Sequence, residues 1–154
     1  MTQAEARVLA ADMGRMAHDP LRWVLYAYKW NEPDGPLSGM SGPQQWQREH
    51  LDYVGRRLRE EPYSPIRVAV SSGHGIGKSA IVAWYVNWGL ATFPNTRVVV
   101  RANTFPQLKT KTFPEISTWW QRSIVRDWFS CEGLRMWFSA QKGFEATWRC
   151  DCVT

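Results

Sequence analysis

The sequence has few cysteines and no long apolar run, and both absences exclude classes of protein. Three cysteines among 154 residues cannot all pair, so we expect reduced thiols rather than a disulfide framework. The longest nearly apolar stretch, residues 81–93, is too short to span a bilayer and contains polar residues and a glycine. The pattern of a secretory signal, a basic start before an apolar block, is also missing. We therefore expect a cytoplasmic protein without a transmembrane helix.

The composition that is present favours a folded, basic protein. Hydrophobic residues make up 44% of the chain and charged residues 21%, which is enough for a packed core and unlike a disordered chain. The length suits one domain, or part of a larger one, and excludes a large multidomain enzyme. A formal net charge of +5 and a pI near 9.4 indicate an anionic partner. Ten tryptophans are expected to serve core and interface packing.

The first 64 residues have helical periodicity interrupted by one loop. Residues 3–17 favour a helix, and apolar side chains at i, i+3, i+4 and i+7 predict another over 21–28. Residues 31–42 hold prolines, glycines and small polar residues, which is the composition of a surface loop. Pro43 suits the first position of a third helix. We expect residues 1–64 to form a helical N-terminal region.

Residues 65–154 begin with a strand, a glycine-rich loop, a helix and a second strand. Residues 66–71 are short, β-branched and mostly apolar, which predicts a strand buried on both faces. Residues 97–102 predict a second strand of the same kind. Between them, a glycine-rich segment precedes apolar residues at helical spacing that extend to residue 93. This order is typical of an α/β core.

The C-terminal third of the chain predicts a broken helix and a hairpin. Residues 104–126 favour a long helix, but Pro114 lacks an N–H group and clashes with the preceding turn. We therefore expect a kink or a break near Phe113. Residues 134–139 and 144–153 resemble two strands around a turn, which predicts a β-hairpin.

The loop after the first strand matches the phosphate-binding pattern G-x-x-x-x-G-K-[ST], with Ser72 in place of the first glycine. Its glycines allow positive φ angles that turn backbone N–H groups toward a phosphate, and the following helix adds its positive end. Lys78 can reach the β- and γ-phosphates, and Ser79 can ligate Mg²⁺. The predicted nucleotide-binding residues of this loop are Ser72, Gly73, His74, Gly75, Ile76, Gly77, Lys78 and Ser79.

Three segments, taken together and in this order, carry a resemblance to a known family. They are GPQQWQREHLDYV, the loop sequence SGHGIGKSA and the downstream RVVVRANTFPQLKTKTFPEISTWW. Over roughly residues 18–150 the chain resembles the ATPase domain of the large terminase subunit of tailed bacteriophages, the motor that packages viral DNA. The resemblance implies a P-loop NTPase fold with ATP and Mg²⁺ as cofactors. It implies double-stranded viral DNA, the portal and the small terminase subunit as partners, a homo-oligomer when complete, and transient location at the procapsid.

The resemblance also assigns roles to individual residues. Gln47 would read the adenine edge, since its amide can both donate and accept; the alternative is a solvated polar residue on a helix. Lys78 would act in catalysis by neutralising phosphate charge. Asn103 and Thr104 would couple the nucleotide site to DNA movement, or would only cap the end of a strand. Many members of the family place a basic residue inside this loop as an added catalytic group, and only His74 is offered here for that role; the alternative is a structural or outward-facing residue.

The acidic motif that ATP hydrolysis requires is missing from every apolar run. Such a motif is a buried strand ending in Asp, which holds Mg²⁺, followed by Glu, which activates water. Asp127 and Asp151 follow runs broken by arginine, so we reject both. In the family this motif lies further along the chain, with the nuclease beyond it. The expected fold is therefore an α/β, truncated P-loop NTPase lacking the Walker B strand, with the helical region in front.

Two other classes of function stay open. One is a non-catalytic nucleotide-binding or DNA-binding module, and the other is an unrelated P-loop ATPase or kinase.

In P-loop ATPases of the terminase type, the strand before the loop and the strand after its helix are not neighbours. The two predicted strands would therefore pair abnormally or leave unpaired edges. Basic side chains on two predicted helices could track phosphates or simply form a solvated face; they lie at 109, 111, 122 and 126 on one helix and at 56, 57 and 59 on another.

Overall fold

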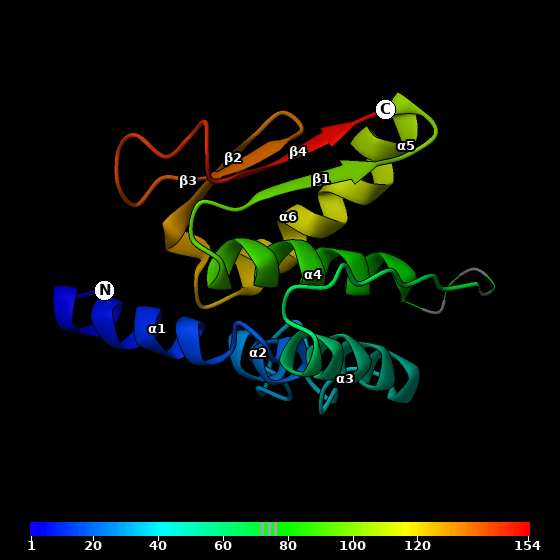
Figure 1. Cartoon of the computed structure of the whole chain (residues 1–154), viewed down its shortest axis with the longest axis horizontal. Coiled ribbons are helices and arrows are strands. Elements are labelled where there is room, and N and C mark those ends of the chain that lie inside the picture. The colour runs from blue at the N-terminus through cyan, green and yellow to red at the C-terminus, as the bar shows by residue number, and fades with distance from the viewer. Residues whose placement is uncertain (72, 74, 76) are drawn as a thin grey trace. The chain divides into compact units, whose positions relative to one another are not determined.

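The computed structural model describes residues 1–71, 73, 75 and 77–154. Ser72, His74 and Ile76 of the predicted phosphate loop therefore lie outside the described residues. The described residues form a mixed α/β protein with a four-stranded sheet. They divide into two compact units, Met1–His74 and Gly75–Thr154 (Figure 1).

The first unit is helical, as its periodicity predicts. It contains α1 (Gln3–Arg15), α2 (Pro20–Ala27) and α3 (Gln45–Glu60). Thr2 caps α1 in a capping box with Glu5. Asp19 caps α2 by accepting a hydrogen bond from the N–H of Arg22. The three predicted helices are confirmed, with the start of α3 two residues after the proline that we expected to open it.

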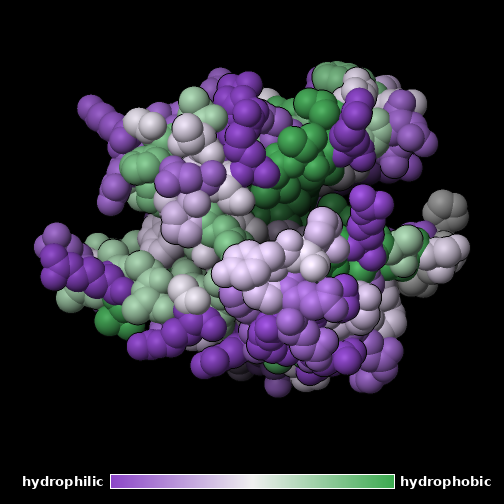
Figure 2. Space-filling model, in the orientation of Figure 1, coloured by the Kyte–Doolittle hydropathy of each residue, from purple (hydrophilic) through white to green (hydrophobic). Residues whose placement is uncertain are grey.

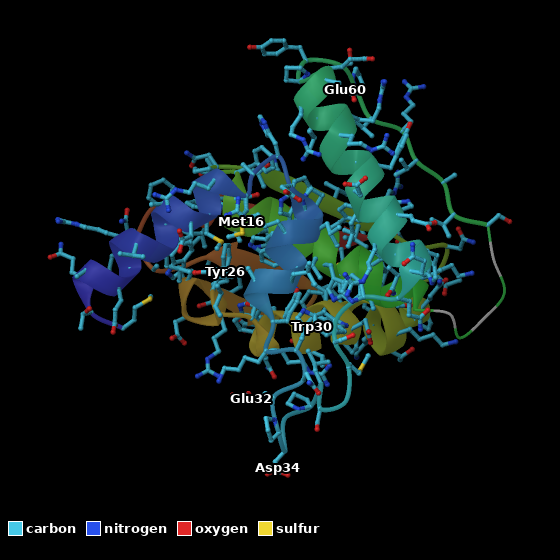
Figure 3. The ribbon with its side chains drawn as sticks, turned by 90° about the horizontal axis from the view of Figure 1, so that it is seen from below. Met16, Tyr26, Trp30, Glu32, Asp34 and Glu60 are labelled. Carbon is cyan, nitrogen blue, oxygen red and sulfur yellow. The ribbon has the colours of Figure 1, made fainter. Side chains whose placement is uncertain are left out.

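The core of this unit forms where the helices meet. The fully buried Trp23 of α2 donates a hydrogen bond to the sulfur of Met13 in α1, at 3.1 Å. Tyr26 also connects the two helices, since its hydroxyl donates to Asp12 at 2.8 Å. Figure 3 labels Tyr26 where α1 and α2 lie side by side, and Asp34 on the loop that follows. The predicted surface loop is confirmed: residues 31–42 contain turns and no helix or strand.

The predicted strand at residues 66–71 is wrong. The segment has no strand assignment, and Val68 and Val70 are 44% and 38% exposed. No described strand pairs with it, because the sheet runs in the order β1-β4-β3-β2 and all four come later in the chain. A β-branched run becomes a strand only where a neighbour supplies hydrogen bonds. Because residues 66–71 form no strand, neither expected outcome, abnormal pairing or an unpaired strand edge, applies to them.

The second unit holds the sheet. Its elements are α4 (Lys78–Thr92), β1 (Arg97–Arg101), α5 (Phe105–Gln107), α6 (Phe113–Arg122), β2 (Phe129–Glu132), β3 (Arg135–Phe138) and β4 (Arg149–Val153). β1 and β4 are parallel, and the other two pairs are antiparallel. Figure 1 shows α4 and α6 on one side of the sheet.

The predicted hairpin is confirmed as β3 and β4, but the sequence analysis missed β2. β2 pairs with β3 across a tight turn in which Gly133 has a φ of 61°. The sequence signal was present: a glycine that follows a short run of mixed polarity is typical of a hairpin turn. The run was overlooked because it is only four residues long.

The predicted break before Pro114 is also confirmed. A π-helical turn, Leu108–Thr112, separates α5 from α6, and Pro114 occupies the first turn of α6. Proline cannot donate to the carbonyl four residues earlier, and a wider turn relieves its clash with that carbonyl. The helix then ends at Arg122, four residues earlier than expected.

Aromatic side chains join the helices to the sheet in this unit. Trp84 of α4 and Trp119 of α6 meet edge to face, with ring centroids 5.1 Å apart. Trp148, just before β4, stacks on Phe138 of β3 at 4.0 Å. These contacts confirm packing as the role of several tryptophans. Across the residues that the structure describes, no helix combines the length and apolar character needed to cross a membrane.

Candidate phosphate-binding site

The backbone in front of α4 has the conformation that the loop pattern predicts at two of its three glycines. Gly75 and Gly77 have φ angles of 79° and 86°, in the left-handed region that side chains avoid. Gly73 does not share this conformation, so the expectation of positive φ is wrong there. A Cβ atom at Gly75 would meet no atom within 4 Å, so only the backbone conformation favours glycine at this position.

The first turn of α4 offers the features that an anion needs. Gly77 is the N-cap, and Lys78 and Ser79 are the first two helical residues. The first N–H groups of a helix have no partner within the helix, and they give this end a partial positive charge. Among the described residues, no side chain caps α4, and its first turn contains no acidic residue. Lys78 is half-buried and Ser79 exposed.

The predicted coupling residues lie at the same end of the second unit. Asn103 and Thr104 follow β1, and Figure 1 shows this end of β1 on the side where α4 begins. Both residues are exposed. The hydroxyl of Thr104 accepts a hydrogen bond from the N–H of Gln107 at 3.3 Å, which caps α5. Thr104 thus has a capping role that requires no nucleotide.

Gln47 has a structural role in the first unit. Its side chain is 3% exposed, and its carbonyl oxygen accepts a hydrogen bond from the N–H of Gln44 at 2.9 Å. This contact belongs to the capping box that opens α3. Gln47 is therefore not the solvated residue offered as the alternative. Its carbonyl oxygen therefore takes part in the cap that opens α3.

Beside Gln47, α3 carries an aromatic groove that the sequence analysis did not predict. Trp46, His50 and Tyr53 line a cavity of about 440 Å³ together with residues 67–69. Burial lowers the pKa of His50, which favours a neutral imidazole. The signal in the sequence was the i, i+4, i+7 spacing of these three side chains, which places them on one face of a helix.

The carboxylates of the second unit are not arranged for metal chemistry. Asp151 accepts from Arg149 at 2.8 Å and from Arg135 at 3.0 Å, with Arg97 3.5 Å away. Asp127 is exposed beside Arg126. Among the described residues, no three His, Cys, Asp or Glu side chains gather as a metal site.

The three cysteines include a neighbouring pair, Cys150 and Cys152, whose hydrogen bond to each other lowers the pKa of Cys152. All three are free thiols, and Cys150 and Cys152 are buried. The hydrogen bond to Cys152 and burial raise the pKa of Cys150, so its thiol stays protonated at neutral pH. Burial likewise raises the pKa of Cys131.

Comparison with known proteins identifies no relative of this chain. No family model matches the chain, and no curated protein or solved structure is significantly similar to it.

Proposed function

We propose that the chain is an ATP-binding part of a phage terminase large subunit, the ATPase that packages viral DNA, with a P-loop NTPase core. The observation that carries the proposal is the sequence Gly77-Lys78-Ser79 at the N-terminus of a 15-residue apolar helix. Gly77 has a left-handed backbone conformation, and Lys78 and Ser79 occupy the first turn of α4. This combination suits a phosphate by charge, by backbone donors and by conformation.

In this proposal each residue of the loop has a defined task. The backbone N–H groups of Gly73, Gly75 and Gly77 cradle the β-phosphate, and Lys78 neutralises the charge on the β- and γ-phosphates. Ser79 supplies one oxygen to Mg²⁺, whose other ligands would be phosphate oxygens and water. The absence of acidic side chains from the first turn of α4 supports the fit, because a carboxylate there would repel the phosphates. Ser72, His74 and Ile76 belong to the same cradle by sequence.

DNA packaging is the wider function that the resemblance supports. Its partners would be double-stranded viral DNA, the portal and the small terminase subunit, with assembly into a homo-oligomer at the procapsid. The net charge of +5 is consistent with a polyanionic partner. A non-catalytic nucleotide-binding or DNA-binding module is the second candidate. It is favoured by one observation, the lack of a gathered carboxylate site among the described residues.

Lys78→Ala tests the proposal directly. We expect it to weaken ATP binding by about 1.5 to 3 kcal/mol, the range for a hydrogen bond to a charged group. This corresponds to a loss of affinity of about 10- to 150-fold. Isothermal titration calorimetry with Mg²⁺ and ATP measures it. Lys109→Ala is the matched control, since it removes an exposed lysine of the same unit. Equal ATP affinity for the parent and Lys78→Ala would refute the phosphate-binding assignment.

Gln47→Ala tests adenine recognition. We expect two separable effects: a lower preference for ATP over GTP, and a loss of about 1 kcal/mol of stability because the capping contact with Gln44 disappears. Competition binding measures the first effect and thermal unfolding the second. Gln45→Ala is the control, because Gln45 is an exposed neighbour on the same helix. A parent protein that binds ATP and GTP equally would rule out adenine reading by Gln47.

A further inference from the structure

The sheet of the second unit has one covered face and one arginine-rich face. Alternate residues of a strand point to opposite faces. Val100, Cys150 and Met136 are buried, on the side of the sheet where α4 and α6 lie. Arg97 and Arg101 of β1 alternate with the buried residues and therefore lie on the other face. Arg149 of β4 and Arg135 of β3 lie on the same face as Arg97, because all three side chains line one shallow hollow. We call this surface the outer face.

The arginines of the outer face outnumber the carboxylates near them. Asp151 alone faces three guanidinium groups, those of Arg149, Arg135 and Arg97, at 2.8, 3.0 and 3.5 Å. Glu132 adds one more carboxylate, at the end of β2 opposite Arg135. The fourth arginine, Arg101, donates a hydrogen bond to the main-chain oxygen of Thr154 at 3.2 Å. The face therefore has a positive excess with guanidinium groups held in place.

The same asymmetry extends over the unit. Residues 75–154 contain ten Lys and Arg against five Asp and Glu, whereas residues 1–74 contain nine of each. The whole formal net charge of +5 therefore belongs to the unit that carries the outer face. A concentrated field of one sign attracts a polyanion and speeds its association.

An aromatic and apolar strip accompanies the arginines. Trp137 of β3 is half-buried and stands opposite Arg149 of β4 and Ser130 of β2 in the sheet register. Val99 of β1 is 58% exposed and lines the same hollow, whose volume is about 790 Å³. Figure 2 shows a hydrophobic patch over β1 with hydrophilic residues on either side. An anion that binds here would need an apolar, planar part as well as its charge.

We propose that the outer face binds single-stranded nucleic acid, with phosphates on the arginines and a base against Trp137. Guanidinium groups contact phosphate oxygens in pairs, and an aromatic ring on an open platform stacks an unpaired base of any sequence. A duplex keeps its base faces inside the stack, so it could use the arginines but not Trp137. An acidic peptide would lack the planar base. This site is separate from the phosphate loop, so its failure would leave the proposed ATP binding intact.

The whole chain tests the site with a fluorescein-labelled oligothymidine of about 20 nucleotides, longer than a typical single-strand site. Fluorescence anisotropy over a range of salt gives the affinity and its salt dependence. We expect Arg97→Ala/Arg101→Ala to weaken binding at least about tenfold. The slope of log K against log salt should fall by about 1.4, or about 0.7 for each lost phosphate contact. Lys109→Ala/Lys111→Ala removes the same charge from exposed positions of the same unit and should leave affinity within about twofold.

Two further comparisons keep the proposal falsifiable. Arg97→Lys/Arg101→Lys keeps the charges but loses the paired guanidinium contacts, so its affinity should lie between those of the parent and the double alanine variant, with a salt slope near the parent's. Trp137→Leu should weaken binding about tenfold without changing the salt slope, as expected for lost stacking. The proposal is overturned if the two double alanine variants lose affinity equally or if Trp137→Leu binds like the parent. It is also overturned if a duplex of the same length, or poly-aspartate, binds as tightly as the single strand.

Discussion

Replacing Trp148 with alanine is expected to lower the free energy of unfolding of the second unit by about 3 to 5 kcal/mol. The indole is 8% exposed and stacks on Phe138 at 4.0 Å, so truncation leaves a cavity between two aromatic groups. The indole N–H also donates to the carbonyl of Leu90 at 2.8 Å. That carbonyl cannot receive its usual helical hydrogen bond, because the residue four positions later is Pro94. Truncation therefore also leaves a buried acceptor without its donor.

Urea unfolding followed by far-ultraviolet circular dichroism measures this loss. Trp148→Phe should cost less than Trp148→Ala, because it keeps the ring stack and loses only the donor to Leu90. Trp137→Ala is a second control, since Trp137 is half-buried on the uncovered side of the same sheet. A loss below about 1 kcal/mol for Trp148→Ala would contradict the central place of this aromatic cluster.

The second prediction concerns catalysis: we expect the 154-residue chain to bind ATP without hydrolysing it. Hydrolysis needs a carboxylate that activates water and another that holds the metal. Asp151 is engaged by three arginines, and Asp127 lies exposed beside Arg126. Binding through the loop alone stabilises the ground state, which does not accelerate the chemical step.

Steady-state phosphate release at saturating ATP tests this expectation. The rate should equal the buffer background and should be the same for Lys78→Ala, the variant that removes the phosphate contact. The contrary result would be turnover of about 1 per second, an ordinary value for enzymes, that Lys78→Ala abolishes. In that case a catalytic carboxylate is present, and Asp127→Asn, Glu132→Gln and Asp151→Asn would identify it.

The sequence by itself determined the features that depend on neighbours along the chain. The caps at Thr2 and Asp19, the apolar spacing of α1 to α4 and the break before Pro114 all follow from contacts within a few residues. The same is true of the loop before α4, because left-handed backbone at Gly75 and Gly77 is a local property of glycine. These elements could be predicted from the local sequence because helical hydrogen bonds join residues four positions apart.

Only the tertiary structure decided the features that depend on distant partners. Residues 66–71 have the composition of a strand, but no described strand pairs with them. β4 obtains its parallel partner from a strand 52 positions earlier, as in the pair Arg97 and Arg149. The arginines around Asp151 likewise come from β1, β3 and β4, and no residue spacing in the sequence predicts that they lie together. Sheet hydrogen bonds and cross-strand contacts join segments that can be far apart in the sequence, and the local sequence does not encode which segments pair. The strand register and the sheet face on which each side chain lies could therefore be known only from the folded chain.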